Sequence, residues 1–257
     1  MEIRILASGS KGNIISLISG NCHLLIDVGI SFTKTKQKFE KYKIDLSSID
    51  GIILTHEHKD HSSGLRIFLK NYPNVPVFLT KGTMDGLDIE TKSSIKNYQF
   101  VEPERYFAIN QIQIYPMLVS HDANEPIGLV ITNNGKKAVF ITDTGYIHKD
   151  YFEVIKDADF YYLEANHDEL MLMQTYKRPH HLKMRILSER GHLSNNEATK
   201  ILNEVIINKR PIWAVAHISE DCNTREKIEM AVVKNFNDPF KAKLIYTSQE
   251  SSKVIKI

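Results

Sequence analysis

Thr55-His56-Glu57-His58-Lys59-Asp60-His61 is the stretch that decides the fold prediction. The apolar run 51–54 before it indicates a buried strand, and Ser62-Ser63-Gly64 after it favours a turn. Three histidines and an aspartate are therefore expected on a loop at the carboxyl end of a strand, where α/β proteins build their sites. The first two histidines point the same way in an extended segment, whereas the aspartate and last histidine follow a turn. One short loop can thus offer ligands to two metal ions; a solvated polar loop is the alternative.

The composition is that of an ordinary globular protein. Of the 257 residues, 42% are hydrophobic and 25% charged, so the chain can bury a core without disulfides. The only cysteines, Cys22 and Cys222, are far apart, which indicates a reducing compartment, and we expect a cytoplasmic protein. No apolar run approaches the roughly 20 residues of a membrane span. The formal net charge of +2 identifies no partner by itself.

Hydrophobic patterning predicts alternating strands and helices in a single domain spanning 1–257. The predicted strands are 2–7, 13–18, 23–27, 51–54, 76–79, 98–101, 111–119, 127–132, 136–142, 160–164, 211–216, 244–247 and 254–257. Asn-Gly at 134–135 predicts a tight hairpin turn. The predicted helices are 31–42, 65–70, 81–88, 149–156, a basic helical region at 168–190, one opened by a capping box at 194–197 and one capped near Asn223.

Metal-compatible residues follow several of these strands. After the histidine loop come His121, Asp143, His167 and His217, each placed where a predicted strand ends. Imidazole together with carboxylate suits zinc and also manganese or iron, and nothing in the sequence supplies a thiolate-rich site. The sequence therefore predicts a metal centre assembled from strand ends.

This pattern resembles the metallo-β-lactamase fold superfamily, which implies an α/β protein with a four-layer αβ/βα sandwich and two divalent metal ions at one edge. Zn²⁺ or Mn²⁺, with iron as a further option, would be the ions. The resemblance assigns His56, His58 and His121 to the first ion, Asp60, His61 and His217 to the second, and Asp143 as the bridge between them.

The aspartate at 143 turns the prediction away from antibiotic hydrolysis, because true β-lactamases of the superfamily commonly have cysteine there. A closer similarity is to the YycJ/WalJ group of bacterial metallo-hydrolases, in the nuclease branch. The motifs that carry it are Leu6–Asn13, Ile26–Ser31, Leu163–Asp168, Arg185–Ser188, Arg190–Asn195, and Ala216–Ser219 followed by Asn223-Thr224.

That group is associated with 5′→3′ exonuclease action on DNA, and the resemblance implies the same here. A metal-bridging hydroxide would attack the phosphodiester, with Asp60 and Asp143 orienting it. His192, which precedes a capped helix N-terminus, and His167 are the predicted proton donors to the leaving 3′ oxygen, and Glu164 could orient either imidazole.

The remaining features bear on how substrate is held. The basic run 177–190 suits a phosphate backbone, with a solvated helix face as the alternative. There is no room for the large β-CASP insertion of RNA-processing and DNA-repair relatives. The expected substrate is nucleic acid, DNA rather than RNA. It would be bound by the basic run, by a homodimer partner or by a host complex. Two other hypotheses are a small-molecule hydrolase acting on a thioester, lactone or cyclic nucleotide, and a non-catalytic metal-binding regulator.

Overall fold

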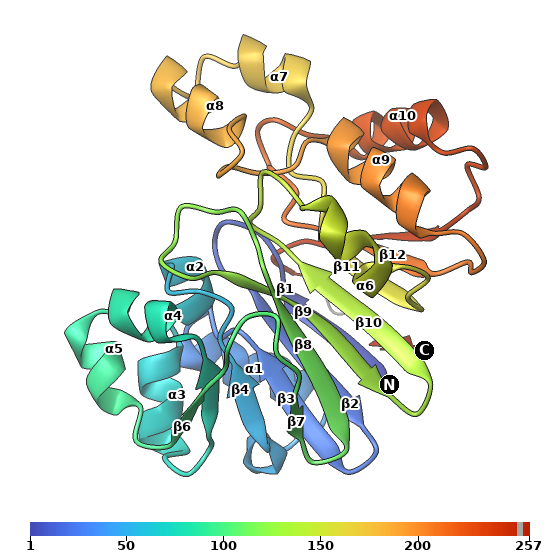
Figure 1. The fold of residues 1–257 in the computed structure, drawn as a ribbon. Coiled ribbons are helices and arrows are strands. Elements are labelled where there is room, and N and C mark those ends of the chain that lie inside the picture. Colours follow the sequence, from blue (N-terminus) through green and yellow to red (C-terminus); the bar gives the residue numbers. More distant parts are fainter. Residues whose placement is uncertain (251–253) are drawn as a thin grey trace. The chain divides into compact units, whose positions relative to one another are not determined.

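The computed structural model describes residues 1–250 and 254–257 (Figure 1). Contacts within the chain divide it into two compact units. Unit 1 comprises Met1–Leu118, Ala123–Ile127 and Gln249–Ile257, and unit 2 comprises Val119–Asp122 and Gly128–Ser248. The single domain expected from the sequence stays a prediction.

Unit 1 is built on a seven-stranded sheet. Its strands are β1 (Glu2–Ala7), β2 (Ile14–Ser19), β3 (Cys22–Ile26), β4 (Gly51–Ile53), β5 (Val77–Leu79), β6 (Tyr98–Phe100) and β14 (Val254–Lys256), in the order β14-β1-β2-β3-β4-β5-β6. Pairing is antiparallel from β14 to β3 and parallel from β3 to β6. The carboxyl ends of β3 and β4 therefore meet at one edge, which places Asp27 beside the histidine loop.

Helices cover this sheet and contribute side chains to its core. They are α1 (Phe32–Lys41), the 3₁₀ turn η1 (Leu46–Ser48), α2 (Lys59–Ser62), α3 (Leu65–Asn71), α4 (Lys81–Gly86) and α5 (Ile89–Ser94). Phe39 of α1 and Phe68 of α3 are buried with strand residues such as Leu25 and Ile52. Figure 1 shows α3 and α5 beside β4 and β6. The predicted start of α1 is confirmed, because the Ser31 side chain accepts from the N–H of Lys34.

Four short elements of unit 1 were not predicted from the sequence: η1, α2, α5 and β7. Asp88 opens α5 by accepting from the N–H groups of Glu90 and Thr91. A three-residue strand, β7 (Phe107–Ile109), pairs antiparallel with β8 (Ile112–Leu118). Both are too short for a clear hydrophobic period, so only the cap of α5 carried a signal.

Unit 2 holds strands in the order β13-β12-β11-β10-β9. They are β9 (Ile127–Asn133), β10 (Lys136–Ile141), β11 (Phe160–Glu164), β12 (Ile212–Ala216) and β13 (Lys243–Tyr246). The predicted hairpin between β9 and β10 is confirmed, and Asn134 and Gly135 have φ of 50° and 72°. A type I′ turn needs positive φ at both central residues. From β10 to β13 all pairing is parallel, so these strands also end at a common edge.

The helices of unit 2 are η2 (Lys149–Tyr151), α6 (Phe152–Ile155), α7 (Glu169–Gln174), α8 (His180–Ile186), α9 (Asn195–Val205) and α10 (Arg225–Asn235). The capping box at Ser194 and Glu197 is confirmed. The helical region 168–190 is in fact two short helices separated at 175–179, and α10 is capped by Thr224 rather than Asn223. Asn223 instead exchanges amide hydrogen bonds with Asn195. None of the helices in the described part of the chain is long and apolar enough to cross a membrane.

Candidate metal centre

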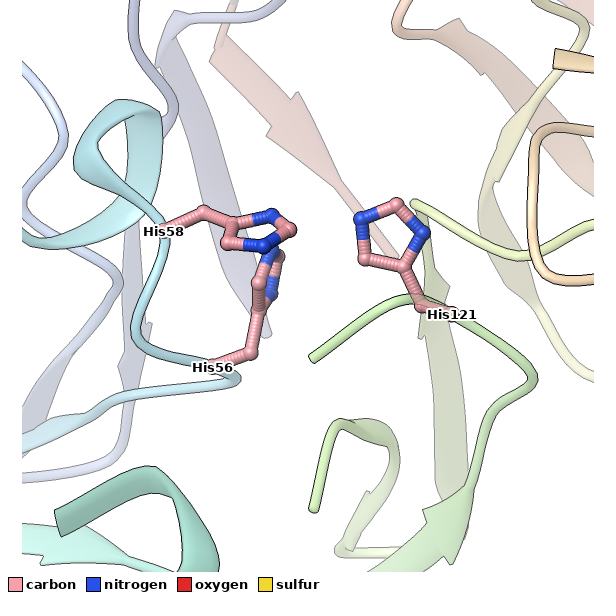
Figure 2. Close-up of side chains that lie close together, drawn as sticks. All are labelled: His56, His58 and His121. Carbon is pink, nitrogen blue, oxygen red and sulfur yellow. The ribbon is translucent and has the colours of Figure 1, made fainter. Parts of the chain in front are cut away.

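The histidine loop of unit 1 gathers three imidazoles after β4. His58 is the N-cap residue of α2, so Asp60 and His61 lie in the first turn of that helix rather than in an open loop. The His56 ring centroid is 4.8 Å from that of His58 and 4.0 Å from that of His61. Figure 2 shows the side chains of His56 and His58 projecting from this loop, together with His121 from the segment after β8. His56 and His61 are buried, and His58 and Asp60 are half-buried.

The carboxylate of Asp27, at the end of the neighbouring strand β3, contacts the Nδ1 side of the His61 ring. Nδ1 of His61 lies 2.7 Å from Oδ2 of Asp27, and both side chains are buried. Thr55 donates its N–H and its hydroxyl to the same carboxylate. Because a carboxylate only accepts, the shared hydrogen belongs to Nδ1 of the imidazole. Nε2 then carries the lone pair, and it lies 3.1 Å from the amide nitrogen of Asn13.

Three strand-end residues adopt left-handed backbone conformations. Asp27 after β3 has φ of 60°, Asp143 after β10 has 57°, and His217 after β12 has 49°. Such conformations cost non-glycine residues on the order of 1–3 kcal/mol and cluster at functional sites. Five other non-glycine residues share this conformation, but these three are an accessory carboxylate and two predicted metal ligands.

The strand ends of unit 2 bring a second group of ligand-type atoms together. Asp143, Glu164, His192 and His217 each offer one atom, and these atoms all lie within 4.8 Å of one another. The parallel register explains the meeting, because Ile141 of β10 pairs with Leu163 of β11, and Glu164 pairs with Ala216 of β12. Residues that follow these pairs must therefore emerge at the same edge.

Glu164 organises this group. Its Oε1 accepts from the N–H groups of Thr144 (2.8 Å) and Leu193 (3.2 Å). Its Oε2 lies 3.1 Å from Nδ1 of His192 and 3.2 Å from Nδ1 of His217. Burial alone would raise the pKa of Glu164, but the charge of His192 and the hydrogen bonds from both imidazoles outweigh it and lower that pKa. A fixed negative charge therefore lies behind two imidazoles.

His217 and His121 have further acidic neighbours. Nδ1 of His217 also lies 3.3 Å from Oδ1 of Asp143. Nε2 of His121 lies 3.3 Å from Oδ1 of Asp122, and its ring centroid is 5.5 Å from that of His192. Burial lowers the pKa of His121, so its imidazole is held in the neutral, ligating form. The second predicted proton donor is placed differently, because His167 is buried and neither of its ring nitrogens has a hydrogen-bond partner among the described residues.

The donor set fits divalent ions. Imidazole nitrogens and carboxylate oxygens are the atoms that zinc and manganese take in proteins. Asp27 behind His61 and Glu164 behind His217 provide the second contact that a ligating imidazole almost always makes. An ion at His61 would replace the Asn13 amide as the partner of Nε2. Each unit therefore carries an imidazole whose Nδ1 contacts a carboxylate, an arrangement that suits a metal ion at Nε2.

Two accessory residues, Asp27 and Glu164, make contacts that the sequence did not predict. The sequence placed Asp27 in a family motif but predicted no role for its side chain, although it follows a strand as directly as His121 does. Glu164 was expected to orient His192 or His167; it contacts His192 and, in place of His167, the proposed ligand His217. Of the remaining histidines, His23 is buried, and His180 and His181 are exposed.

Comparison with known proteins supports the resemblance drawn from the motifs. The family model of the Beta-lactamase superfamily domain matches residues 23–213. Exodeoxyribonuclease YycJ of Bacillus anthracis is 32% identical over 90% of this chain and 88% of its own length. Exodeoxyribonuclease WalJ of Streptococcus pneumoniae is 30% identical over 89% of this chain and 86% of its own length.

The fold prediction is confirmed by a solved structure. The metallo-β-lactamase fold protein YhfI of Bacillus subtilis superposes with a TM-score of 0.75, covering 99% of this chain and 99% of its own. The sequence identity is only 15%, so this likeness concerns the fold alone.

Proposed function

The chain belongs to the Beta-lactamase superfamily of metal-dependent hydrolases, and from that premise we propose that it is a binuclear phosphodiesterase that degrades DNA from its 5′ end. Its relatives at 30–32% identity are named exodeoxyribonucleases, and they are matched over most of their length. The 5′→3′ direction follows the group to which the motifs are similar.

The proposed ligands come from both units. His56, His58 and His121 would hold one ion, Asp60, His61 and His217 the other, and Asp143 would bridge them. Zinc and manganese both suit this set of donors. When bound, the ions would supply Lewis-acid stabilisation of the phosphate and a water acidified enough to serve as nucleophile near neutral pH.

His192 is the proposed proton donor. A 3′ oxygen leaving a phosphodiester needs a proton, and an imidazole backed by a carboxylate can hold one ready. Glu164 supplies that carboxylate at 3.1 Å from Nδ1, and the His192 side chain keeps 19% of its surface exposed. Asp60, half-buried at the start of α2, would orient the attacking water.

His167 remains a weaker candidate for the same step. Its pKa is lowered to about 4, chiefly by burial, so it is neutral at pH 7 and has no proton to spare beyond its single N–H. Of the two predicted donors, His192 is the one whose ring nitrogen contacts a carboxylate, Oε2 of Glu164 at 3.1 Å.

The observation that carries this proposal is the single oxygen of Glu164 shared by His192 and His217. It links a proposed ligand and a proposed proton donor through one buried charge. An imidazole that contacts a buried carboxylate, next to the group of proposed ligands, suits a leaving group that must be protonated. Both cysteines are unpaired and buried, which agrees with the cytoplasm as the proposed location.

The test uses the purified full chain with Mn²⁺ or Zn²⁺. Single- and double-stranded DNA, and RNA, are labelled at either end and followed by gel and by nucleotide release, with Asp60→Ala as the inactive control. We expect mononucleotides released progressively from the 5′ end of DNA. Thioester turnover with no nucleotide release above the control would favour the small-molecule hydrolase, and no turnover of any substrate by a metal-loaded protein would favour the regulator.

A further inference from the structure

The basic run 177–190 does not act as one surface. Lys177 pairs with Asp221 at 2.6 Å, and Arg178 lies 4.0 Å from the same carboxylate. Lys183 is buried and donates to the carbonyl of Met173 at 2.8 Å, so it holds α7 against α8. All three cations have partners at or near α7, and the buried Lys183 cannot face a phosphate, so the run is not a uniform phosphate-binding face.

Arg185 of α8 is placed differently, because its contacts lead to the proposed metal ligands. Its guanidinium pairs with Oδ2 of Asp122. The other oxygen of Asp122 lies 3.3 Å from Nε2 of His121. The His121 ring is in turn next to that of His192. One carboxylate therefore separates the Arg185 cation from a proposed ligand, and all of these residues belong to unit 2.

The backbone fixes the position of the segment that carries Arg185. A Cβ on Gly145 would come within 2.2 Å of the carbonyl oxygen of Ser188, a distance that no side chain tolerates. The turn after Asp143 thus packs directly on the turn after α8. Gly145 also donates its N–H to Ser120, next to His121. The segment that carries Arg185 is therefore packed against the turns that carry two proposed ligands, Asp143 and His121.

We propose that Arg185 binds a backbone phosphate of the nucleic-acid strand, next to the phosphodiester under attack. A guanidinium has five N–H donors in a planar fork, and one carboxylate uses at most two. The side chain is 58% exposed, so the remaining donors face water. An exposed ion pair contributes only about 0–1 kcal/mol, which an incoming phosphate can match. Asp122 then serves to aim the guanidinium while the strand is absent.

This inference rests on the proposed nuclease function, and its test separates the two. Arg185→Ala is compared with wild type on DNA and on bis(p-nitrophenyl) phosphate, a phosphodiester too small to reach beyond the metal centre. Arg210→Ala is the matched control. Arg210 is also an exposed arginine paired with an aspartate, Asp238 at 3.2 Å, but it precedes β12 and so lies at the opposite end of the strand from His217.

We expect Arg185→Ala to raise KM for DNA on the order of tenfold, the loss typical of a charge-assisted hydrogen bond. The effect on DNA should exceed the effect on the small diester by the same factor. The slope of log K against log salt for binding labelled DNA should fall by about 0.7–0.9, one phosphate contact. Arg210→Ala should behave as wild type in all three measurements.

Equal KM and equal salt slope for wild type and Arg185→Ala would overturn the inference. So would parallel losses on DNA and the small diester with reduced metal content, because Arg185 would then only support the ligands. If wild type cleaves neither substrate, the nuclease proposal fails, and the binding slope still decides on Arg185. Wild type that does not bind DNA overturns the inference directly.

Discussion

Nδ1 of His61 lies 2.7 Å from the carboxylate of Asp27, which emerges from the neighbouring strand at a left-handed φ of 60°. The backbone conformation is unfavourable for a residue with a side chain, yet it is retained where it aims a carboxylate at a proposed ligand. Asp27→Asn tolerates the same φ but removes the charge behind the imidazole. We expect metal affinity to fall about 10–100-fold, as for other residues that orient ligands. Metal titration with a competing chelator measures it.

Asp88→Asn is the control for that substitution. Asp88 is also a hydrogen-bonding aspartate of unit 1, but it caps α5, where asparagine serves equally well. Its metal affinity should match wild type. An unchanged affinity in Asp27→Asn, with native circular dichroism, would contradict the orienting role of the carboxylate.

Asp143→Asn should reduce the number of bound ions as well as the rate. Asparagine keeps the left-handed turn at φ of 57°, so the fold should survive the change. The proposed bridge needs two negatively charged oxygens, and an amide supplies a single neutral one. We expect metal analysis to find fewer than two ions per chain. Two retained ions would mean that Asp143 does not bridge them.

The strand-end pattern made much of this site predictable. Each predicted ligand follows an apolar run in the sequence. Such a run predicts a strand even when the neighbouring strands in the sheet are unknown. The convergence of Glu164 on two imidazoles was less accessible, because it depends on the parallel register of β10, β11 and β12. A single sequence shows where a strand ends but not which strand end lies next to it.

The basic run 177–190 shows what composition alone could not predict. Its composition predicted a phosphate-binding face, but side-chain partners are set by tertiary packing. Asp221 and the carbonyl of Met173 take three of the five cations, and neither is marked by sequence spacing. Only the structure distinguishes Arg185, whose partner Asp122 follows His121 in the chain.

His192→Gln should slow DNA cleavage by about 10²–10⁴-fold, the usual contribution of a general acid. Glutamine has no acidic proton to give, so the loss should be much smaller on a p-nitrophenyl diester, whose leaving group needs no proton. Metal content should stay at the wild-type value, because His192 is proposed as a donor of protons and not as a ligand. Loss of an ion in this variant would make His192 a ligand instead. Equal slowing on both diesters would argue against proton donation.

His23 should make the free energy of unfolding depend on pH in a region remote from the metal centre. Its ring is buried, with Nε2 2.8 Å from the hydroxyl of Ser16 and Nδ1 2.9 Å from that of Ser48. Burial first, and then the charge of Arg4, lower its pKa to about 4 from 6.5. Between these pH values the unfolded chain binds a proton that the folded chain does not, so the contribution of His23 to stability is complete above pH 6.5 and is lost as the pH falls towards 4.

The comparison with His23→Gln isolates this effect, since glutamine keeps polar contacts with both serines and does not titrate. In the presence of a chelator, the free energy of unfolding of wild type relative to the variant should fall by up to about 3 kcal/mol between pH 7 and pH 4. Denaturant unfolding at several pH values measures the difference, and other titrating groups cancel because both proteins contain them. A difference that stays constant with pH would mean that the buried imidazole binds its proton as readily in the folded chain as in the unfolded one.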